Sequence, residues 1–179
     1  MKRIFILAAI IVPMIWTACS GNKTESTEDI IPKGMKALDL KAMGYPVKIN
    51  VPDSNYFPTI DSSATANGAN IRIGQHFDIL VNFATPEDAD LEKQKGLLAA
   101  TDAGVSTVLT SDSFSLVWET KFGDTGYQHF IHIVKIGKDN YFVRDNNNNI
   151  ENQFKKADID KMMESAKSLR ARPVDAPKS

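Results

Sequence analysis

The sequence predicts an α+β fold in which a mostly antiparallel β-sheet is packed by a C-terminal helix and a shorter middle helix. Three observations predict it. Apolar and polar residues alternate over several segments with the period of two that a half-buried strand shows. Residues 158–169 instead repeat apolar residues every three or four positions, as one face of a helix does. Residues 86–100 begin with helix-start residues and separate the two groups of strands.

The first eighteen residues have the layout of a secretory signal. Lys2 and Arg3 precede an apolar run from Ile4 to Ile15, and Thr17-Ala18 supplies small residues at its end. The run is shorter than the roughly 20 apolar residues that a bilayer-spanning helix needs. We therefore expect residues 1–18 to be removed rather than kept as a transmembrane anchor.

Cys19 is the one cysteine of the chain, so no intramolecular disulfide can form. Because it directly follows Thr17 and Ala18, the segment resembles the lipobox at which a bacterial lipoprotein receives its diacylglycerol. Trp16 departs from that motif, which usually has Leu, Val or Ile three residues before the cysteine. The resemblance implies lipidation of Cys19 and attachment to a membrane. The alternative is an ordinary signal peptide with a cysteine near its cleavage site.

Residues 19–32 are poor in apolar side chains, and we expect them to form a flexible polar tether. Ser20 follows the cysteine where an aspartate commonly signals inner-membrane retention, which favours the outer membrane. The charged residues of the tether resemble the export signals of surface lipoproteins; they are Lys23, Glu25, Glu28 and Asp29. Periplasmic and surface orientations both fit such a tether.

The charge balance of the mature chain is mildly acidic. The 21 basic residues of the full chain lose Lys2 and Arg3 with the signal, which leaves 19 against 22 acidic residues and a formal charge of −3. A protein that binds a nucleic-acid backbone needs a concentrated basic face, so this balance argues against nucleic acid as a partner. We expect membrane attachment to come from acyl chains instead.

Residues 33–172 are predicted to form a single domain, followed by a flexible tail over 173–179. The domain begins with an extended segment in which Val47, Ile49 and Val51 alternate with polar residues. Proline fits best at a strand end or a sheet edge, where its missing N–H is not needed. Because prolines flank this segment on both sides, we expect the strand to lie at or near an edge.

A longer extended stretch follows, with apolar residues at odd positions only: Ile71, Ile73, Phe77, Ile79, Val81 and Phe83. Gly74 and Gln75 interrupt the alternation, so the stretch contains either a bulge or a break between two strands. The even positions include Arg72, His76 and Asp78. We expect these three side chains to form a polar face that is a candidate binding surface.

The middle helix is predicted over 86–100. Thr85 is the expected N-cap, Pro86 suits the first helical position, and the acids that follow favour the positive end of the helix dipole. Its apolar face is thin and consists chiefly of Leu91 and Leu98. The helix should therefore cover a sheet loosely or lie at one end of it.

The second group of strands is predicted over 105–109, 114–122 and 127–136. The last of these has apolar side chains on both faces and should be central in the sheet. A tight turn over 137–140 then joins it to a hairpin partner, 141–144.

The closing helix has one buried stripe, formed by Ile159, Met162, Met163, Ala166 and Leu169. Asp158 and Asp160 stand in its first turn, and Lys167 and Arg170 in its last, as the helix dipole prefers. We interpret both methionines as core residues rather than as a partner-binding surface. Pro173 prevents continuation of the helix.

Three features together resemble the PsbP-like family. They are the strand entered through Gly44-Tyr45-Pro46, the hairpin strand Tyr141-Phe142-Val143, and the closing helix that ends in Ser168-Leu169. The resemblance covers most of Gly44 to Arg170 in the order of its elements. It implies an antiparallel sheet flanked by helices, and it favours a non-enzymatic role because that family is mostly known for accessory and binding functions. The chain also resembles the small bacterial lipoproteins of unassigned function.

Metal sites have little support in the sequence. His129 and His132 lie three apart on a predicted strand and should point to opposite faces, so one zinc ion cannot take both. The residues that alternate as calcium ligands would are Asp145, Asn147 and Asn149. Ile150 and Lys156 then occupy the positions where an EF-hand needs glycine and glutamate. We expect neither a metal nor a cofactor.

We therefore expect a non-enzymatic binding or accessory lipoprotein. One alternative is a carrier of a small molecule or glycan, with a pocket between sheet and helices. The second alternative is a hydrolase-type enzyme that uses His76 and Asp78. No Gly-x-Ser-x-Gly motif is present, so no serine is singled out as a nucleophile.

Overall fold

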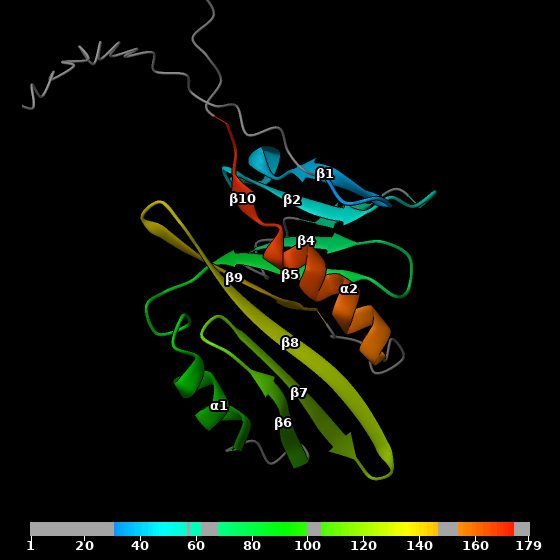
Figure 1. The fold of residues 1–179 in the computed structure, drawn as a ribbon, viewed down its shortest axis with the longest axis vertical. Helices are drawn as coiled ribbons and strands as arrows, with labels where there is room; N and C mark the ends of the chain where they lie inside the picture. The colour runs from blue at the N-terminus through cyan, green and yellow to red at the C-terminus, as the bar shows by residue number, and fades with distance from the viewer. Residues whose placement is uncertain (1–30, 57, 62–67, 100–104, 147–153, 174–179) are drawn as a thin grey trace, which may run out of the picture.

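The computed structural model describes residues 31–56, 58–61, 68–99, 105–146 and 154–173. They form an α+β fold with two antiparallel sheets, of three and seven strands, and two α-helices (Figure 1). The predicted fold class is confirmed at this level, including the packing of the C-terminal helix on the sheet. The predicted signal, Cys19 and nearly all of the tether lie outside the described residues.

The smaller sheet has the order β1-β2-β10. Its strands are β1 (Met35–Asp39), β2 (Val47–Pro52) and β10 (Arg170–Ala171), and a 3-10 helix (Lys41–Met43) follows β1. Strand β2 was predicted at or near an edge; β1 and β10 pair on its two sides, so it lies next to an edge and not at one. The flanking prolines are compatible with this place because Pro46 precedes the strand and Pro52 is its last residue.

The larger sheet has the order β3-β4-β5-β9-β8-β7-β6. Its strands are β3 (Thr59–Asp61), β4 (Ala69–Arg72), β5 (Asp78–Phe83), β6 (Val105–Ser111), β7 (Ser115–Phe122), β8 (Thr125–Ile136) and β9 (Asp139–Asp145). Every neighbouring pair is antiparallel. Strands β3 and β6 are therefore the two edges.

The stretch from Ile71 to Phe83 is two strands, so the break that the sequence left open is confirmed. Strands β4 and β5 pair directly, with Arg72 opposite Asp78. The chain reverses between them, where Gly74 has a φ of 62°. Glycine suits this place because a side chain rarely adopts that backbone conformation.

Strand β8 is an interior strand, as its apolar residues on both faces predict. The hairpin from β8 to β9 is also confirmed, with Ile136 opposite Asp139 and Gly137 in the left-handed region at the turn. The alternation of buried residues places Phe130 on one face of the sheet and Ile131 and Ile133 on the other.

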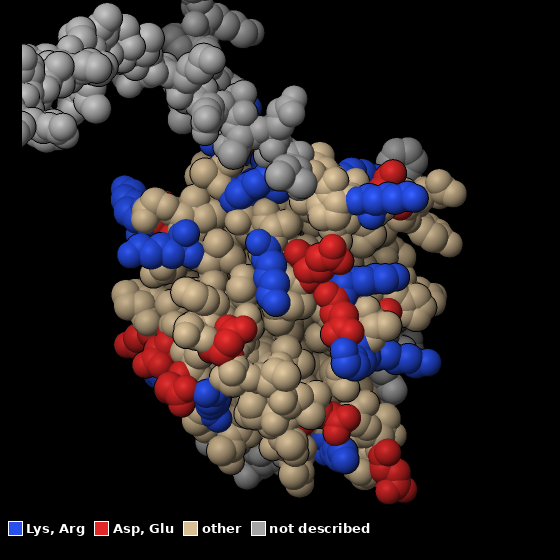
Figure 2. All heavy atoms as spheres, in the orientation of Figure 1, with Lys and Arg blue, Asp and Glu red and all other residues tan. Residues whose placement is uncertain are grey.

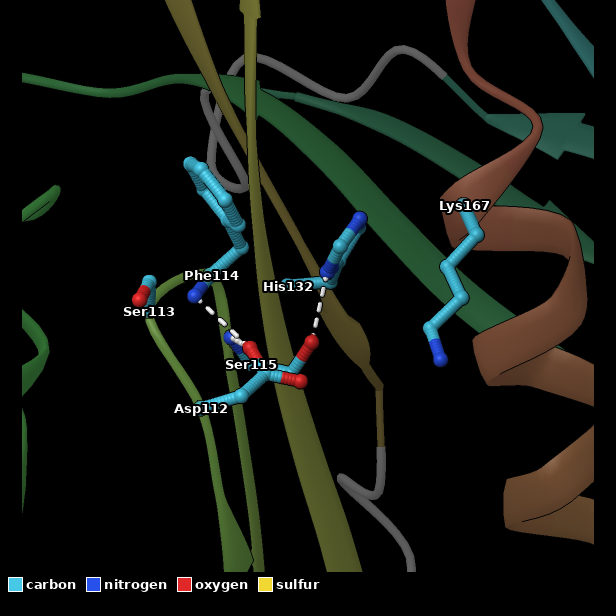
Figure 3. Close-up of a pocket in the computed structure, with 6 residues that line it drawn as sticks. All are labelled: Asp112, Ser113, Phe114, Ser115, His132 and Lys167. Atoms are coloured by element: carbon cyan, nitrogen blue, oxygen red, sulfur yellow. Dashed lines mark hydrogen bonds between the residues drawn. The ribbon is translucent and has the colours of Figure 1, made fainter.

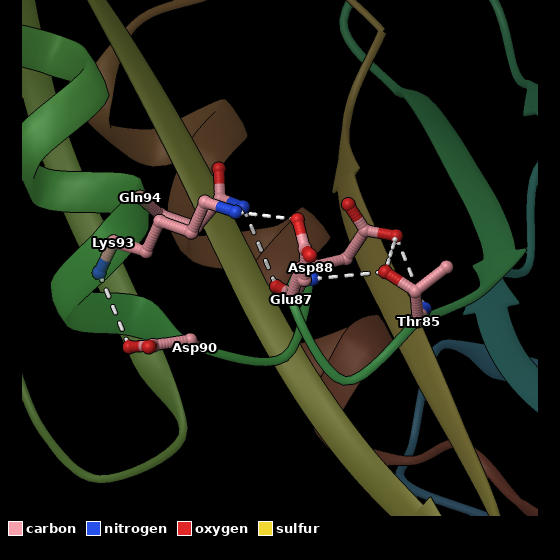
Figure 4. Close-up of polar contacts among 6 residues, drawn as sticks. All are labelled: Thr85, Glu87, Asp88, Asp90, Lys93 and Gln94. Carbon is pink, nitrogen blue, oxygen red and sulfur yellow. Dashed lines mark hydrogen bonds and ion pairs between the residues drawn. The ribbon is translucent and has the colours of Figure 1, made fainter.

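The middle helix, α1 (Leu91–Ala99), begins five residues later than predicted. Thr85 does not cap it. The Thr85 hydroxyl accepts a hydrogen bond from the Asp88 N–H, and the Asp88 carboxylate accepts one from the Thr85 N–H, which closes a separate turn (Figure 4). The Asp90 carboxylate instead accepts hydrogen bonds at 3.1 Å from the Glu92 and Lys93 N–H groups, as an N-cap does.

The closing helix, α2 (Lys156–Lys167), carries the predicted buried stripe except for Leu169, which is buried just beyond its end. Arg170 was predicted in the last turn but lies in β10, because the helix ends at Lys167. At its start the Asp158 carboxylate accepts a hydrogen bond from the Lys155 N–H. Met162 is fully buried, and its sulfur accepts a contact of 3.4 Å from the Asp78 N–H of β5. Helix α2 thereby lies against both sheets, and the interpretation of its methionines as core residues is confirmed.

Two hydrophobic clusters lie on opposite faces of the larger sheet. The major cluster joins the small sheet, α2 and the inner strands; its members include Val47, Ile49, Ile71, Ile79, Phe130, Tyr141, Ile159 and Met162. The minor cluster lies under α1 and contains Leu91, Leu116, Ile131 and Ile133. Because α1 contacts only β6 and β7 closely, it covers one end of the sheet, as its thin apolar face predicts.

Candidate functional site

A hollow of about 330 Å³ opens between the larger sheet and the last turn of α2. The turn between β6 and β7 forms one side of it, β8 forms the floor, and α2 supplies the opposite side (Figure 3). Six residues line it, namely Asp112, Ser113, Phe114, Ser115, His132 and Lys167. The hollow brings together residues from three elements that are far apart in the sequence.

Asp112 holds the β6–β7 turn in shape. One of its carboxylate oxygens accepts hydrogen bonds at 2.7 Å from the N–H groups of Phe114 and Ser115. These backbone hydrogen bonds, that of Phe114 first, lower the pKa of the Asp112 carboxyl below its usual value. The carboxylate is therefore a fixed negative charge at the rim, and the Phe114 ring beside it is 59% exposed.

Ser115 and His132 form the floor as a directly opposed pair on β7 and β8. The Ser115 Oγ lies 2.9 Å from the His132 Nδ1, and both residues are buried. Burial lowers the pKa of His132, and the nearby Lys167 charge lowers it further. The imidazole is thus neutral at pH 7, since its ordinary pKa of 6.5 is already below that pH.

Lys167 supplies the positive charge of the hollow. It stands in the last turn of α2 and is exposed, and no carboxylate of the described residues lies within ion-pair distance of its ammonium group. The hollow therefore presents a cation on one side, the Asp112 anion on the other, and a neutral imidazole between them. Such an arrangement is suited to a small polar molecule that carries charge.

The Ser115–His132 pair has two of the three parts of a nucleophilic triad, but their arrangement differs from that of a working one. In a triad a carboxylate orients the imidazole through the ring nitrogen that does not contact the serine. Here the Asp112 carboxylate is bonded to turn amides, and the Ser115 hydroxyl is buried beneath the hollow. The geometry favours holding a ligand over attacking one.

The structure brings two of the three predicted polar-face residues together. Arg72 Nε lies 3.8 Å from an Asp78 carboxylate oxygen, and the Asn146 amide donates to the other oxygen at 3.4 Å. Burial raises the pKa of Asp78 to about 6, despite the lowering effects of Asn146 and Arg72. His76 instead lies in the turn between the strands, with its Nδ1 3.5 Å from the Asp158 carboxylate of α2.

The two strand histidines lie in separate surroundings. His129 Nδ1 is 2.8 Å from an Asp145 carboxylate oxygen, and its ring stacks on Trp118 with centroids 5.2 Å apart. The other Asp145 oxygen accepts a hydrogen bond from the buried Phe130 N–H. Within the described ranges, no three His, Cys, Asp or Glu side chains converge as metal ligands would.

The remaining predicted residues are only partly described. Asp145 is engaged as above, while Asn147 and Asn149 of the calcium-like pattern lie outside the described residues, as does Cys19. Among the helices of the described part, none is long and apolar enough to cross a membrane.

Sequence reasoning missed the hollow. The available signal was weak: Ser115 and His132 become neighbours only once the register of β7 against β8 is known, and Lys167 reaches them only through the packing of α2. Comparison with family models and with curated proteins found no match to this chain.

Proposed function

We propose that this chain is a lipid-anchored, non-enzymatic binding module of the bacterial outer membrane. The observation that carries the binding role is the hollow, in which Lys167 and Asp112 present opposite charges without pairing to each other. A pocket between sheet and helix with a few convergent polar groups is typical of a small-molecule site. Within the binding class, the hollow favours a small charged ligand.

The anchoring role rests on the sequence around Cys19. The signal-like segment 1–18 ends at a lipobox-like step, and the polar segment 19–32 separates Cys19 from β1. A flexible chain of that length holds a domain on the order of 20 Å from the lipid surface. The hollow would then face the periplasm or the cell exterior, depending on the side of the membrane that the anchor occupies.

We also propose that the fold is PsbP-like. The segment Gly44-Tyr45-Pro46 leads into β2, Tyr141-Phe142-Val143 lies in β9, and α2 closes the domain on the sheet, which is the order of elements that the resemblance implies. Accessory and binding roles are the common functions of that family. This supports a binding role for the present chain.

The surface charge favours a partner other than nucleic acid. Figure 2 shows basic and acidic side chains interspersed over the face that it presents, rather than gathered by sign. Counterion release from a phosphate backbone needs several basic groups on one face. The net charge of −3 after removal of the signal adds to this argument.

Nuclear magnetic resonance of the His132 side chain tests the binding role. A panel of amino acids, short dicarboxylates and amino sugars is added to the full chain in detergent micelles, and ligands that shift the His132 resonances are titrated. Lys167→Ala should weaken such a ligand about tenfold or more, as loss of one charged contact does. Lys161→Ala, on the same helix but outside the hollow, is the matched control. No shift with any probe at about 10 mM would contradict the hollow as a ligand site.

The Ser115–His132 contact favours a hydrolase as the second candidate function. A fluorophosphonate probe tests it, because this reagent labels an activated serine covalently. We expect no labelling, since Ser115 is buried and the nearby Asp112 carboxylate is bonded to turn amides rather than to the imidazole. Labelling that disappears in Ser115→Ala would replace the binding role with an enzymatic one.

A further inference from the structure

The edge strand β6 differs from every other sheet edge of the described residues. It is seven residues long, with the sequence Val-Ser-Thr-Val-Leu-Thr-Ser, and holds neither a charge nor a proline. Six of its seven residues are exposed, among them Val105 at 72%, Val108 at 43% and Leu109 at 45%. An edge strand with these properties offers a row of backbone N–H and C=O groups to another strand.

The other edges of the described residues are guarded in the usual ways. Strand β3, at the far end of the same sheet, has three residues. In the small sheet, β1 carries Lys36 and Asp39, and β10 has two residues, one of them Arg170. Short length and charge are the devices that keep an edge from pairing with another chain. Strand β6 is neither short nor charged, and its β-bulge affects only the part after Val108, so Val105–Val108 is the open part of this edge.

We propose that β6 pairs antiparallel with β6 of a second copy of this chain. A second copy is the occupant that the observations favour, because each copy presents the same open edge and one pairing satisfies both. The pairing brings no like charges together, because β6 contains no charged residue. It also closes as a two-fold dimer rather than extending into a fibre, because each β6 is used once and the opposite edge, β3, has three residues.

The β-bulge in β6 limits where the pairing runs. The register against β7 shifts between Val108 and Thr110, and a bulge of this kind bends an edge. The regular part is Val105–Val108. A two-fold axis perpendicular to the sheet and beside Thr107 would relate the two strands. Thr107 would then lie opposite Thr107 of the second molecule, and Ser106 opposite its Val108. Two β-branched side chains thereby come to the centre of the interface, where cross-strand pairs of this type stabilise a sheet.

The expected dimer is weak in dilute solution. Pairing of one short strand buries less than the roughly 1,200 Å² of a standard stable interface. If Cys19 is lipidated as proposed, confinement to a membrane raises the effective concentration of copies to the millimolar range, which favours association.

Sedimentation equilibrium of the full chain in a mild, density-matched detergent tests the pairing between about 10 µM and about 1 mM. Thr107→Lys places two like charges opposite each other at the centre and should weaken the dimer about tenfold or more. Thr59→Lys, a threonine at the opposite edge of the same sheet, is the matched control and should dimerise as the wild type does. Equal thermal unfolding midpoints of the variants show that folding is unchanged.

A second measurement keeps the result independent of protein stability. Thr107→Cys should give a covalent dimer with a short bis-maleimide, and Thr59→Cys should give none, because the proposed lipidation leaves the thiol of Cys19, the one native cysteine, unable to react. A wild type that stays monomeric at the highest concentration would overturn the proposal. So would a dimer that Thr107→Lys leaves intact, or equal crosslinking of the two cysteine variants.

Discussion

The Asp78 carboxyl should make the stability of this domain depend on pH, and Asp78→Asn isolates the effect. Asp78 begins β5 and its side chain is 12% exposed, with Asn146 as a hydrogen-bond donor and Arg72 at 3.8 Å. Burial raises its pKa from 3.8 to about 6 in the folded protein. Asparagine has nearly the same shape as the neutral acid but does not titrate, so the variant removes the pH dependence and little else.

The sign follows from the two pKa values. Below pH 3.8 the carboxyl is protonated in both states and contributes no pH-dependent term. Between 3.8 and about 6 the unfolded chain releases the proton while the folded chain keeps it, so folding stability falls as pH rises. Above about pH 6 the folded protein has lost all of the stability that depends on protonated Asp78, which is at most about 3 kcal/mol. Because the nearby Arg72 guanidinium stabilises the ionised carboxyl, we expect a loss of about 1–3 kcal/mol.

Urea unfolding at pH 4, 5, 6, 7 and 8 measures this difference. The free energy of unfolding of Asp78→Asn minus that of the wild type should rise by about 1–3 kcal/mol from pH 4 to pH 8, mostly below pH 7. Asp160→Asn, an exposed residue of α2, is the control and should change by no more than about 0.5 kcal/mol. A constant difference for Asp78→Asn, or one that falls with pH, would refute the burial argument.

The other predictions concern single buried contacts, each measured by urea unfolding at pH 7. Met162→Ala should destabilise the domain by about 2–5 kcal/mol, because it leaves a cavity between α2 and both sheets. The control Lys161→Ala should change the free energy of unfolding by no more than about 0.5 kcal/mol. A loss below about 1 kcal/mol for Met162→Ala would contradict its assignment to the core. Asp145→Ala should cost about 1–3 kcal/mol, because the buried Phe130 N–H loses its acceptor; an unchanged midpoint would show that this hydrogen bond contributes nothing.

The elements that the sequence predicts well are those with a clear period. The stripe of α2 and the alternation of the later strands depend on burial of one face, which local sequence records directly. The interior position of β8 could also be predicted from sequence, because apolar residues on both of its faces must be covered on both sides of the sheet.

The exact place of a strand in its sheet depends on partners far along the chain. Strand β2 is central because β1 and β10 pair with it, and neither shows clear alternation, β1 having a mixed burial pattern and β10 two residues. The start of α1 was misjudged for a local reason. Thr85 and Asp90 are both good caps, and the reciprocal bonds of Thr85 with Asp88 use the first one in a separate turn.

The candidate site was also predictable only where its residues are close together in the sequence. Arg72 and Asp78 could be predicted to share a polar face because they are close in the sequence, and the hairpin of β4 and β5 does bring them together. Ser115, His132 and Lys167 meet only through strand register and helix packing, which no short window of sequence contains. A hollow built from three elements is therefore found from structure alone.

The most direct test of lipid anchoring at Cys19 is the chemistry of the mature N-terminus. Bacteria expressing the full chain are fed an alkyne fatty acid, and the purified protein is examined for label and by mass spectrometry of its N-terminal peptide. We expect a chain that begins at Cys19, carries diacylglycerol on its thiol, and loses the label in Cys19→Ser. An unlabelled chain with a free Cys19 thiol, or one cleaved elsewhere, would contradict a lipid-anchored module.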